Sequence, residues 1–447
     1  MSIEENEELN YPEESLKGFF KEHFGPSILW ALMGIGASHI IIAPVLGAKY
    51  GIFAIWMIVG VYLVKYGAWD LGIIYNYGHG RNPVEGYGDL PGPKNWGRYF
   101  TLFIYLGAWT IILGAVGTGA ASFISALIPG LGMVNWYLVL IGLAIAFLLV
   151  TGYNVIENVL KVFVIALAPL IILGLIITPP SPETITQTAF RIPDLTSAAF
   201  LSLFAAAAGY MPTGLSTTIS IGSWSLAKKE GASALRNQGK DPSKEKYHEY
   251  IKKWIKTGKR DFKIGFGFSL ILIISTTALA ASVLYPRGII PSGGKTPIVI
   301  GNLLKNLLGT WAFPVVGIAA FAALYSTVLT VLDGASRVAS DIIPMIKETK
   351  TNTEKWRKTF IILMPLASII PVLSFGELPV VITTFSAGLM AIFGPFFYFA
   401  NYYIVKKHLP KKFHPTKKRT TFYITCMIIT IFFGIIGAIG KLGLLGL

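Results

Sequence analysis

The sequence predicts an all-α integral membrane protein, and three observations lead to that fold class. Hydrophobic residues make up 53% of the 447 residues and charged residues only 14%, whereas a soluble protein carries about 25% charged residues. Apolar runs of roughly 20 residues, the length that crosses a bilayer as a helix, recur about eleven times along the chain. Two of these runs are interrupted in the middle by glycine, proline and polar residues.

The first interrupted run extends over residues 25–51 and carries Gly34, Gly36, Ser38 and His39 near its middle. A membrane helix normally bonds its own backbone, because lipid offers no other partner. Glycines beside polar side chains therefore indicate an unwound stretch whose half-helix ends face a cavity and a substrate. The alternative is a continuous helix whose glycines allow close packing and whose His39 bonds a neighbouring helix.

The second interrupted run covers residues 204–226 and contains Gly209, Pro212, Thr213 and Gly214. Proline lacks an N–H and clashes with the preceding turn, so a break or kink is expected there. Two interrupted helices at corresponding positions of two halves are typical of the binding site of a secondary transporter. A simple proline kink is the alternative for this run.

The remaining elements follow in order along a single transmembrane domain, residues 25–447. Residues 1–24 are polar and acidic, do not resemble a signal peptide, and are expected to form a cytoplasmic tail whose end (15–24) is an interfacial helix. The fifth span ends before Pro179. The other spans are expected at about 26–48, 52–76, 100–127, 135–152, 197–227, 264–285, 311–346, 359–374, 378–405 and 420–441.

The basic residues predict the orientation. Residues 228–263 hold twelve Lys and Arg against five acids, and residues 347–358 and 406–419 are also basic. The positive-inside rule therefore predicts a multi-pass protein of the cell membrane with a cytoplasmic N-terminus and an external C-terminus. The net charge of +15 then reflects topology rather than a nucleic-acid partner. Segment 228–263 is either a solvated connector or a surface for anionic lipid headgroups or regulation.

Several short motifs resemble the natural resistance-associated macrophage protein (NRAMP) family of proton-coupled divalent-metal transporters. The first span begins with Gly25-Pro26 and ends with Gly-Ala-Lys-Tyr-Gly at 47–51, and the sixth contains Met-Pro-Thr-Gly at 211–214. Val-Gly-Thr at 116–118 and Gly152 with Ile-Glu at 156–157 also match. The resemblance implies a LeuT-like 5+5 inverted-repeat fold, with repeats at 25–178 and 196–405 and an eleventh span.

The same resemblance implies a substrate site, with several departures from the family. The family's metal-binding Asp falls on Gly36 and its Asn on His39, while its proton-linked His falls on Thr213. Its acids of the third span fall on Ile111 and Gly114. The expected substrate-binding residues are Gly36, Ser38, His39, Ala208, Met211 and Thr213, of which His39, Met211 and the Ala208 carbonyl would be the metal ligands.

The leading functional prediction is a secondary active transporter with alternating access for a divalent metal ion. Without a carboxylate the donors are soft, which suits a transition metal better than Mg²⁺ or Ca²⁺. His39 is alternatively a proton-linked group. The other hypothesis is a transporter of the same fold for a small organic solute or an uncoupled cation. Paired breaks argue against a channel.

Neither enzymatic nor ATP-driven chemistry is expected. The sequence has no His-Glu-x-x-His, Gly-x-Ser-x-Gly or P-loop motif. No cofactor is predicted, the only partners expected are the substrate and the lipid bilayer, and a monomer is the default state.

Further polar residues lie within the predicted spans. Asp333, Arg337 and Asp341 are spaced four apart on one helical face and indicate an inner gate or ion pair, or else a pair that only stabilises packing. Lys65 and Asp70 are interpreted as structural. The hydroxyls of Ser326, Thr327 and Thr330 could serve a sodium-type site or simply bond across helices.

Overall fold

The computed structural model describes residues 9–150, 168–292, 309–349, 351–376 and 378–444, with isolated positions between 298 and 305. The elements assigned in these residues are helices throughout. The predicted motif at Gly152, Ile156 and Glu157 lies outside the described residues, as does the first part of the fifth span.

The helices carry these bounds: α1 (Leu16–Gly18), η1 (Phe19–His23), α2 (Pro26–Gly34), η2 (Ser38–Ile42), α3 (Ala43–Tyr50), α4 (Phe53–His79), α5 (Pro83–Gly86), η3 (Tyr87–Asp89), α6 (Trp96–Leu106), α7 (Ala108–Leu127), α8 (Met133–Val150), α10 (Pro182–Thr188), α11 (Ala198–Tyr210), η4 (Leu215–Thr217), α12 (Thr218–Ala227), α13 (Ala232–Asn237), η5 (Glu245–Tyr247), α14 (His248–Val283), η6 (Tyr285–Arg287), α16 (Ala312–Lys347), α17 (Thr353–Phe375), α18 (Pro379–His408), η8 (Lys411–Phe413) and α19 (Lys417–Leu444).

The number of spans agrees with the sequence prediction of about eleven. Within the described residues, nine helices are long and apolar enough to cross a membrane. A tenth span is formed if the helix at Ala168–Ile177 and α10, which meet at 102°, are counted together. The interrupted first span, which is divided among α2, η2 and α3, is the eleventh span.

The first span is broken as predicted. Helix α2 begins with Pro26 in its first turn, where the missing N–H costs nothing. It ends at Gly34, and Ile35 leaves the helical conformation with φ −77° and ψ 48°. The chain then passes through the π-helical turn η2 into α3. Gly34 is needed here because a Cβ at this position would lie 2.8 Å from the Pro212 carbonyl oxygen.

The sixth span is broken at the residues that the sequence singled out. Helix α11 ends at Tyr210, and Met211 is extended with φ −97° and ψ 126°. Pro212 has no N–H with which to continue the helix. The chain resumes through η4 and α12. The Gly34 contact shows that the two breaks touch, so two segments far apart in sequence form one centre.

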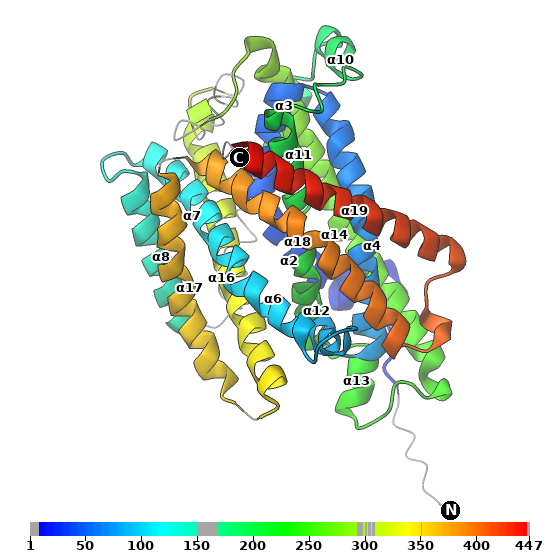
Figure 1. Ribbon diagram of the computed structural model, residues 1–447. Coiled ribbons are helices and arrows are strands. Elements are labelled where there is room, and N and C mark those ends of the chain that lie inside the picture. The colour runs from blue at the N-terminus through cyan, green and yellow to red at the C-terminus, as the bar shows by residue number, and fades with distance from the viewer. Residues whose placement is uncertain are drawn as a thin grey trace, which may run out of the picture.

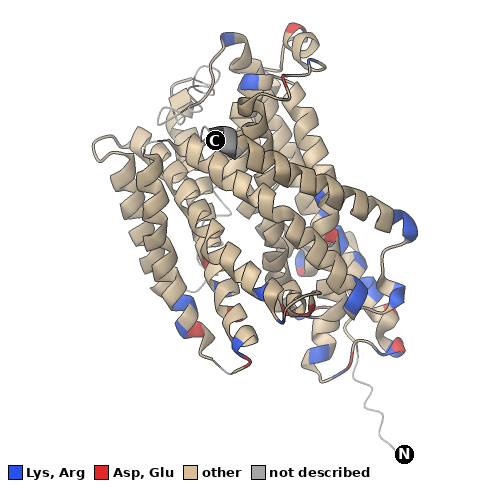
Figure 2. Ribbon diagram, in the orientation of Figure 1, with Lys and Arg blue, Asp and Glu red and all other residues tan. Residues whose placement is uncertain are grey.

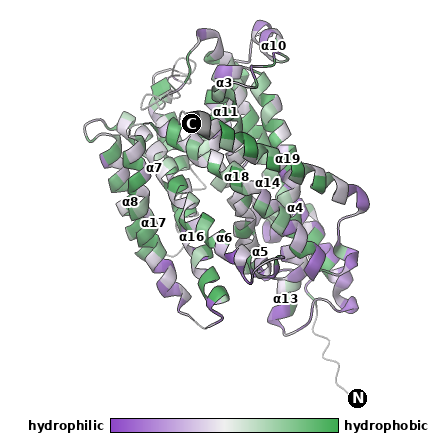
Figure 3. Ribbon diagram, in the orientation of Figure 1, coloured by the Kyte–Doolittle hydropathy of each residue, from purple (hydrophilic) through white to green (hydrophobic). Residues whose placement is uncertain are grey.

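The long helices pack around this centre. Helix α16 packs on α7, α11 on α18, and α14 on both α3 and α4. In Figure 1, α8 and α17 lie together on one flank, while α18 and α19 run obliquely across the molecule. Apolar residues cover the lengths of these helices (Figure 3). Most Lys and Arg lie at the end of the molecule that holds α13 (Figures 1 and 2).

Much of the predicted polar connector at 228–263 is helical. It contains α13, and α14 begins at His248 rather than near 264. The first turns of α14 bury Tyr250 and Trp254 against the N-terminal tail. The indole N–H of Trp254 donates to the Asn10 carbonyl at 3.3 Å, and Tyr250 meets Tyr11 edge to face. The N-terminal tail thus packs on the part of α14 that precedes the predicted span.

Candidate functional site

A buried cavity of about 40 Å³ lies where the two breaks meet. Its walls come from the first and sixth spans together with α7, α16 and α18. The polar groups on its walls belong to Ser38, Tyr210, Thr213, Ser216, Thr217 and Thr327. Most of the other lining residues are apolar, including the thioethers of Met33 and Met390. This volume is sufficient for a water molecule or an ion, and the lining contains no carboxylate.

Tryptophan side chains fix the wall contributed by η4. The Thr217 hydroxyl accepts hydrogen bonds from the indole N–H groups of Trp30 and Trp69, each at 3.1 Å. The indole of Trp109 donates to the Ser216 hydroxyl at 3.3 Å. These residues come from the first, second and third spans, so the geometry of η4 depends on three other segments of the bundle.

His39 is placed beside the cavity but turned away from it. Its side chain is completely buried. The Nδ1 atom lies 2.8 Å from the Ser38 hydroxyl and 3.0 Å from the Gly34 carbonyl, and Nε2 lies 3.1 Å from the Ser269 carbonyl of α14. Both ring nitrogens are therefore engaged by the protein, and the imidazole joins the broken first span to α14.

The structure brings together only part of the predicted substrate site. Ser38 and Thr213 line the cavity, whereas Gly36, His39, Ala208 and Met211 do not. A Cβ at Gly36 would approach Thr327, 3.0 Å from its Cβ, so Thr327 fills the space beside that position. Across the described residues, no group of three or more His, Cys, Asp and Glu side chains could hold a metal ion.

Lys65, which the sequence analysis interpreted as structural, reaches the broken end of α11. Its Nζ donates to the carbonyls of Ala208 at 2.8 Å, Gly209 at 3.1 Å and Thr213 at 2.7 Å. The predicted metal-binding carbonyl of Ala208 thus accepts a hydrogen bond from the Lys65 side-chain nitrogen. The sequence did contain a signal for this, since a lysine within an apolar span commonly marks a functional position.

Asp70, on the same helix as Lys65, has different partners. It lies 3.0 Å from the Lys259 ammonium of α14 and accepts a hydrogen bond from the Tyr423 hydroxyl of α19. The two charges of α4 therefore serve separate contacts, and Asp70 links three helices.

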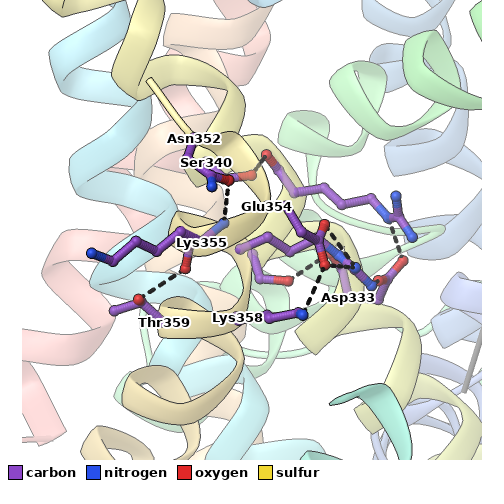
Figure 4. A network of polar contacts seen from close by, with 10 residues as sticks. Asp333, Ser340, Asn352, Glu354, Lys355, Lys358 and Thr359 are labelled. Carbon is purple, nitrogen blue, oxygen red and sulfur yellow. Dashed lines mark hydrogen bonds and ion pairs between the residues drawn. The ribbon is translucent and has the colours of Figure 1, made fainter. Parts of the chain in front are cut away.

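The predicted ion pair on the eighth span forms, and it extends to the ninth. Arg337 Nε lies 2.8 Å from one oxygen of Asp333, and Arg357 of α17 lies 2.9 Å from the other. Figure 4 shows this network with Glu354, which also faces Arg357. Asp341 is exposed and makes no ion pair within the described part of the chain. The cluster joins α16 to α17.

Helix α14 holds the N-terminal end of α2 through Asp261. One carboxylate oxygen of Asp261 accepts the Gly25 N–H at 3.1 Å and the other accepts the Ser27 N–H at 2.9 Å. Nearby, His23 Nδ1 lies 2.9 Å from a Glu230 oxygen. Burial raises the pKa of the Glu230 carboxyl, and the hydrogen bond with His23 opposes that change. These contacts attach the start of the first span to the segment after the sixth.

Two helices broken face to face around a buried cavity, inside a bundle of membrane-spanning helices, define a membrane transporter of the LeuT-like class. The fold matches a manganese transporter of Eremococcus coleocola with a TM-score of 0.72, 14% identity, and coverage of 98% of this chain and 90% of that one. It also matches MhsT, solved with L-phenylalanine, with a TM-score of 0.56 and 14% identity over 96% of this chain and 99% of that one.

The family follows from the sequence itself. Residues 27–439 match the model of the natural resistance-associated macrophage protein-like family, and the chain belongs to that family of membrane transporters. An uncharacterized protein of Pasteurella multocida is 24% identical over 360 residues, which is 79% of this chain and 78% of that protein. The family resemblance predicted from the motifs at 25–51 and 211–214 is thereby confirmed.

Proposed function

We propose that this protein is a secondary active transporter that moves a metal ion across the membrane by alternating access. The observation that carries the proposal is the buried cavity between the paired breaks. A substrate held there would contact half-helix ends that can separate when the bundle rearranges. The family membership and the fold shared with a manganese transporter support a metal ion as the substrate.

The chemistry of the cavity favours a soft ion within this proposal. Its donors are the thioethers of Met33 and Met390 and the hydroxyls of Ser38, Thr213 and Thr327. Mg²⁺ and Ca²⁺ need hard, charged oxygen ligands, whereas thioethers select softer transition metals. A transition-metal ion is therefore the substrate that these side chains would hold best.

A small uncharged solute is the second candidate, and a specific observation favours it. The cavity lining contains no carboxylate, and most of it is apolar. A dication that enters such a site loses hydration without a compensating negative charge. A solute of a few heavy atoms with one or two hydroxyl contacts would not incur this cost.

Transport by the purified protein in liposomes distinguishes the two candidates. We expect uptake of Zn²⁺, and weaker uptake of the harder Mn²⁺, but not of Mg²⁺ or Ca²⁺, and we expect Met33→Leu and Met390→Leu each to lower Zn²⁺ affinity by about tenfold. Met57→Leu, which alters a buried methionine of α4 outside the cavity lining, is the matched control. Failure to take up any dication would reject the metal proposal, and counterflow of a small solute would then support the second candidate.

Orientation and repeat structure belong to the same proposal. The basic end of the molecule (Figure 2) would face the cytoplasm, and the opposite end would face the cell exterior. The segments 25–178 and 196–405 would form the two repeats that move against each other. Accessibility of tags placed at the two termini tests the orientation directly.

A further inference from the structure

The broken end of α11 holds three backbone carbonyls that point toward one atom. A helix leaves its last carbonyls without intrahelical partners, and in this helix they belong to Ala208 and Gly209. Thr213, in the unwound stretch that follows, contributes the third carbonyl. All three lie 2.7–3.1 Å from Lys65 Nζ. We call this set of carbonyls the α11 cage.

The occupant of the α11 cage is the Lys65 side-chain nitrogen, and the geometry of the cage fits its ammonium form. Three acceptors within hydrogen-bond distance require three N–H donors, which an ammonium has and a neutral amine lacks. Lys65 is only 1% exposed, and no carboxylate lies within 4 Å of its Nζ among the described residues. The charge is balanced instead by the carbonyls, by the negative end of the α11 dipole and by the Trp69 ring, whose centroid is 5.5 Å away.

This arrangement matches the way in which broken helices hold free ions. In such transporters the carbonyl ends of half-helices and of unwound backbone coordinate a cation. Neutral carbonyls without a carboxylate suit a monovalent cation, as in the filters of potassium channels. In this protein the position is filled by a side chain of the neighbouring helix α4.

We propose that Lys65 is a built-in monovalent cation that occupies the α11 cage and excludes free cations from it. Lys65 is then a specificity-determining residue, because it removes the Ala208 carbonyl from the set of ligands that a transported ion could use. Lys65 would occupy the cage in the same way whether the substrate is a metal ion or a small solute.

The cage also influences the cavity, since the two share Thr213. The carbonyl of Thr213 accepts from Lys65, while the same residue lines the cavity. A substrate in the cavity therefore lies next to a fixed positive charge. A metal ion would have to bind through the thioethers and hydroxyls alone, and an uncharged or anionic group would be favoured at the Thr213 side.

Removal of the ammonium tests the proposal. Lys65→Met keeps a flexible apolar stem against Trp69 and leaves the three carbonyls bare. We expect the purified variant to bind Tl⁺, a probe for monovalent cations, at least about a hundredfold more tightly than the wild-type protein, because a second cation a few ångströms from an ammonium is strongly repelled. Binding is measured by isothermal titration. Lys49→Met, which removes a half-exposed ammonium at the end of α3, should leave Tl⁺ affinity unchanged.

Two further measurements keep the proposal testable if Lys65→Met does not fold. Methylammonium should raise the melting temperature of Lys65→Ala but not that of Lys49→Ala, since it can replace the lost group. Crystals of the wild-type protein soaked in thallium or manganese salt should show no anomalous density at the carbonyls of Ala208, Gly209 and Thr213.

The outcomes separate this proposal from the transport proposal. Equal Tl⁺ affinity of wild type and Lys65→Met, or a metal peak at the cage of the wild-type protein, overturns the built-in cation whatever the substrate. Absence of uptake of any dication in liposomes overturns the metal substrate but leaves the cage assignment intact, because cage occupancy is measured by binding and diffraction.

Discussion

Replacing Asp261 by Asn should loosen the first half-helix of the broken first span. The Asp261 carboxylate is buried and accepts the N–H groups of Gly25 and Ser27 at 3.1 and 2.9 Å. Asparagine has one acceptor oxygen, so one of the two N–H groups loses its partner. A lost cap costs about 1 kcal/mol, and a buried N–H left without a partner costs about 1–3 kcal/mol. We expect Asp261→Asn to destabilise the docked position of α2 by about 1–2 kcal/mol in total. This free-energy change shifts the equilibrium between docked and displaced α2 by about 5- to 30-fold.

The equilibrium in question is the outward swing of α2 that the proposed alternating access would require. It can be read from the reaction of a cysteine placed at Ala31, which is fully buried on α2, with a water-soluble maleimide. The single native cysteine, Cys426, is buried on α19 and is first replaced by alanine. We expect Asp261→Asn to increase the labelling rate of Ala31→Cys by about 5- to 30-fold.

The matched control is Asp194→Asn. Asp194 also accepts a backbone N–H, from Thr196 at 2.9 Å, but it lies in an exposed loop away from α2. Its replacement should leave labelling unchanged. Unchanged labelling in Asp261→Asn, or an equal increase in both variants, would refute the idea that Asp261 holds α2 closed.

Two further predictions concern contacts made by the eighth span, α16. Gly36→Asp, which restores the carboxylate implied by the family, should destabilise the protein by about 1–3 kcal/mol because its side chain meets Thr327. The double variant Gly36→Asp with Thr327→Ala should recover most of the thermal stability and bind Mn²⁺ in titration. Recovery of stability without any binding would contradict a metal site at this position. Asp333→Asn breaks contacts to two arginines and should lower the free energy of unfolding by about 3 kcal/mol. Asp341→Asn, at an exposed position of the same helix, should lower it much less. Equal decreases for the two variants would show that the Asp333 ion pairs contribute nothing specific to stability.

Much of the architecture could be predicted from the sequence, because the membrane imposes a strict rule. Every backbone group in lipid must be bonded within a helix, so apolar length alone indicates the spans. Residues that violate this rule, such as Gly34 and Pro212, then identify the breaks. The motif at 47–51 added the family, which the match over residues 27–439 confirms.

Which of the predicted residues line the cavity could not be inferred from the sequence. Ser38 and Thr213 line the cavity, but the direction of a side chain is set by its rotamer and by the helix that it faces. The spacing of residues within the first span cannot reveal that the His39 side chain contacts Ser269, which is 230 residues away in the sequence. The same holds for α14, whose start at His248 depends on contacts with the N-terminal tail.

By itself, then, the sequence determined the helical membrane class, the two breaks and the family, since these follow from local hydropathy, backbone chemistry and short motifs. Only the tertiary structure decided which groups meet at the breaks. Lys65 and Ala208 are 143 residues apart, and their contact exists because the packing of α4 against α11 places an ammonium where the broken helix leaves its carbonyls unpaired.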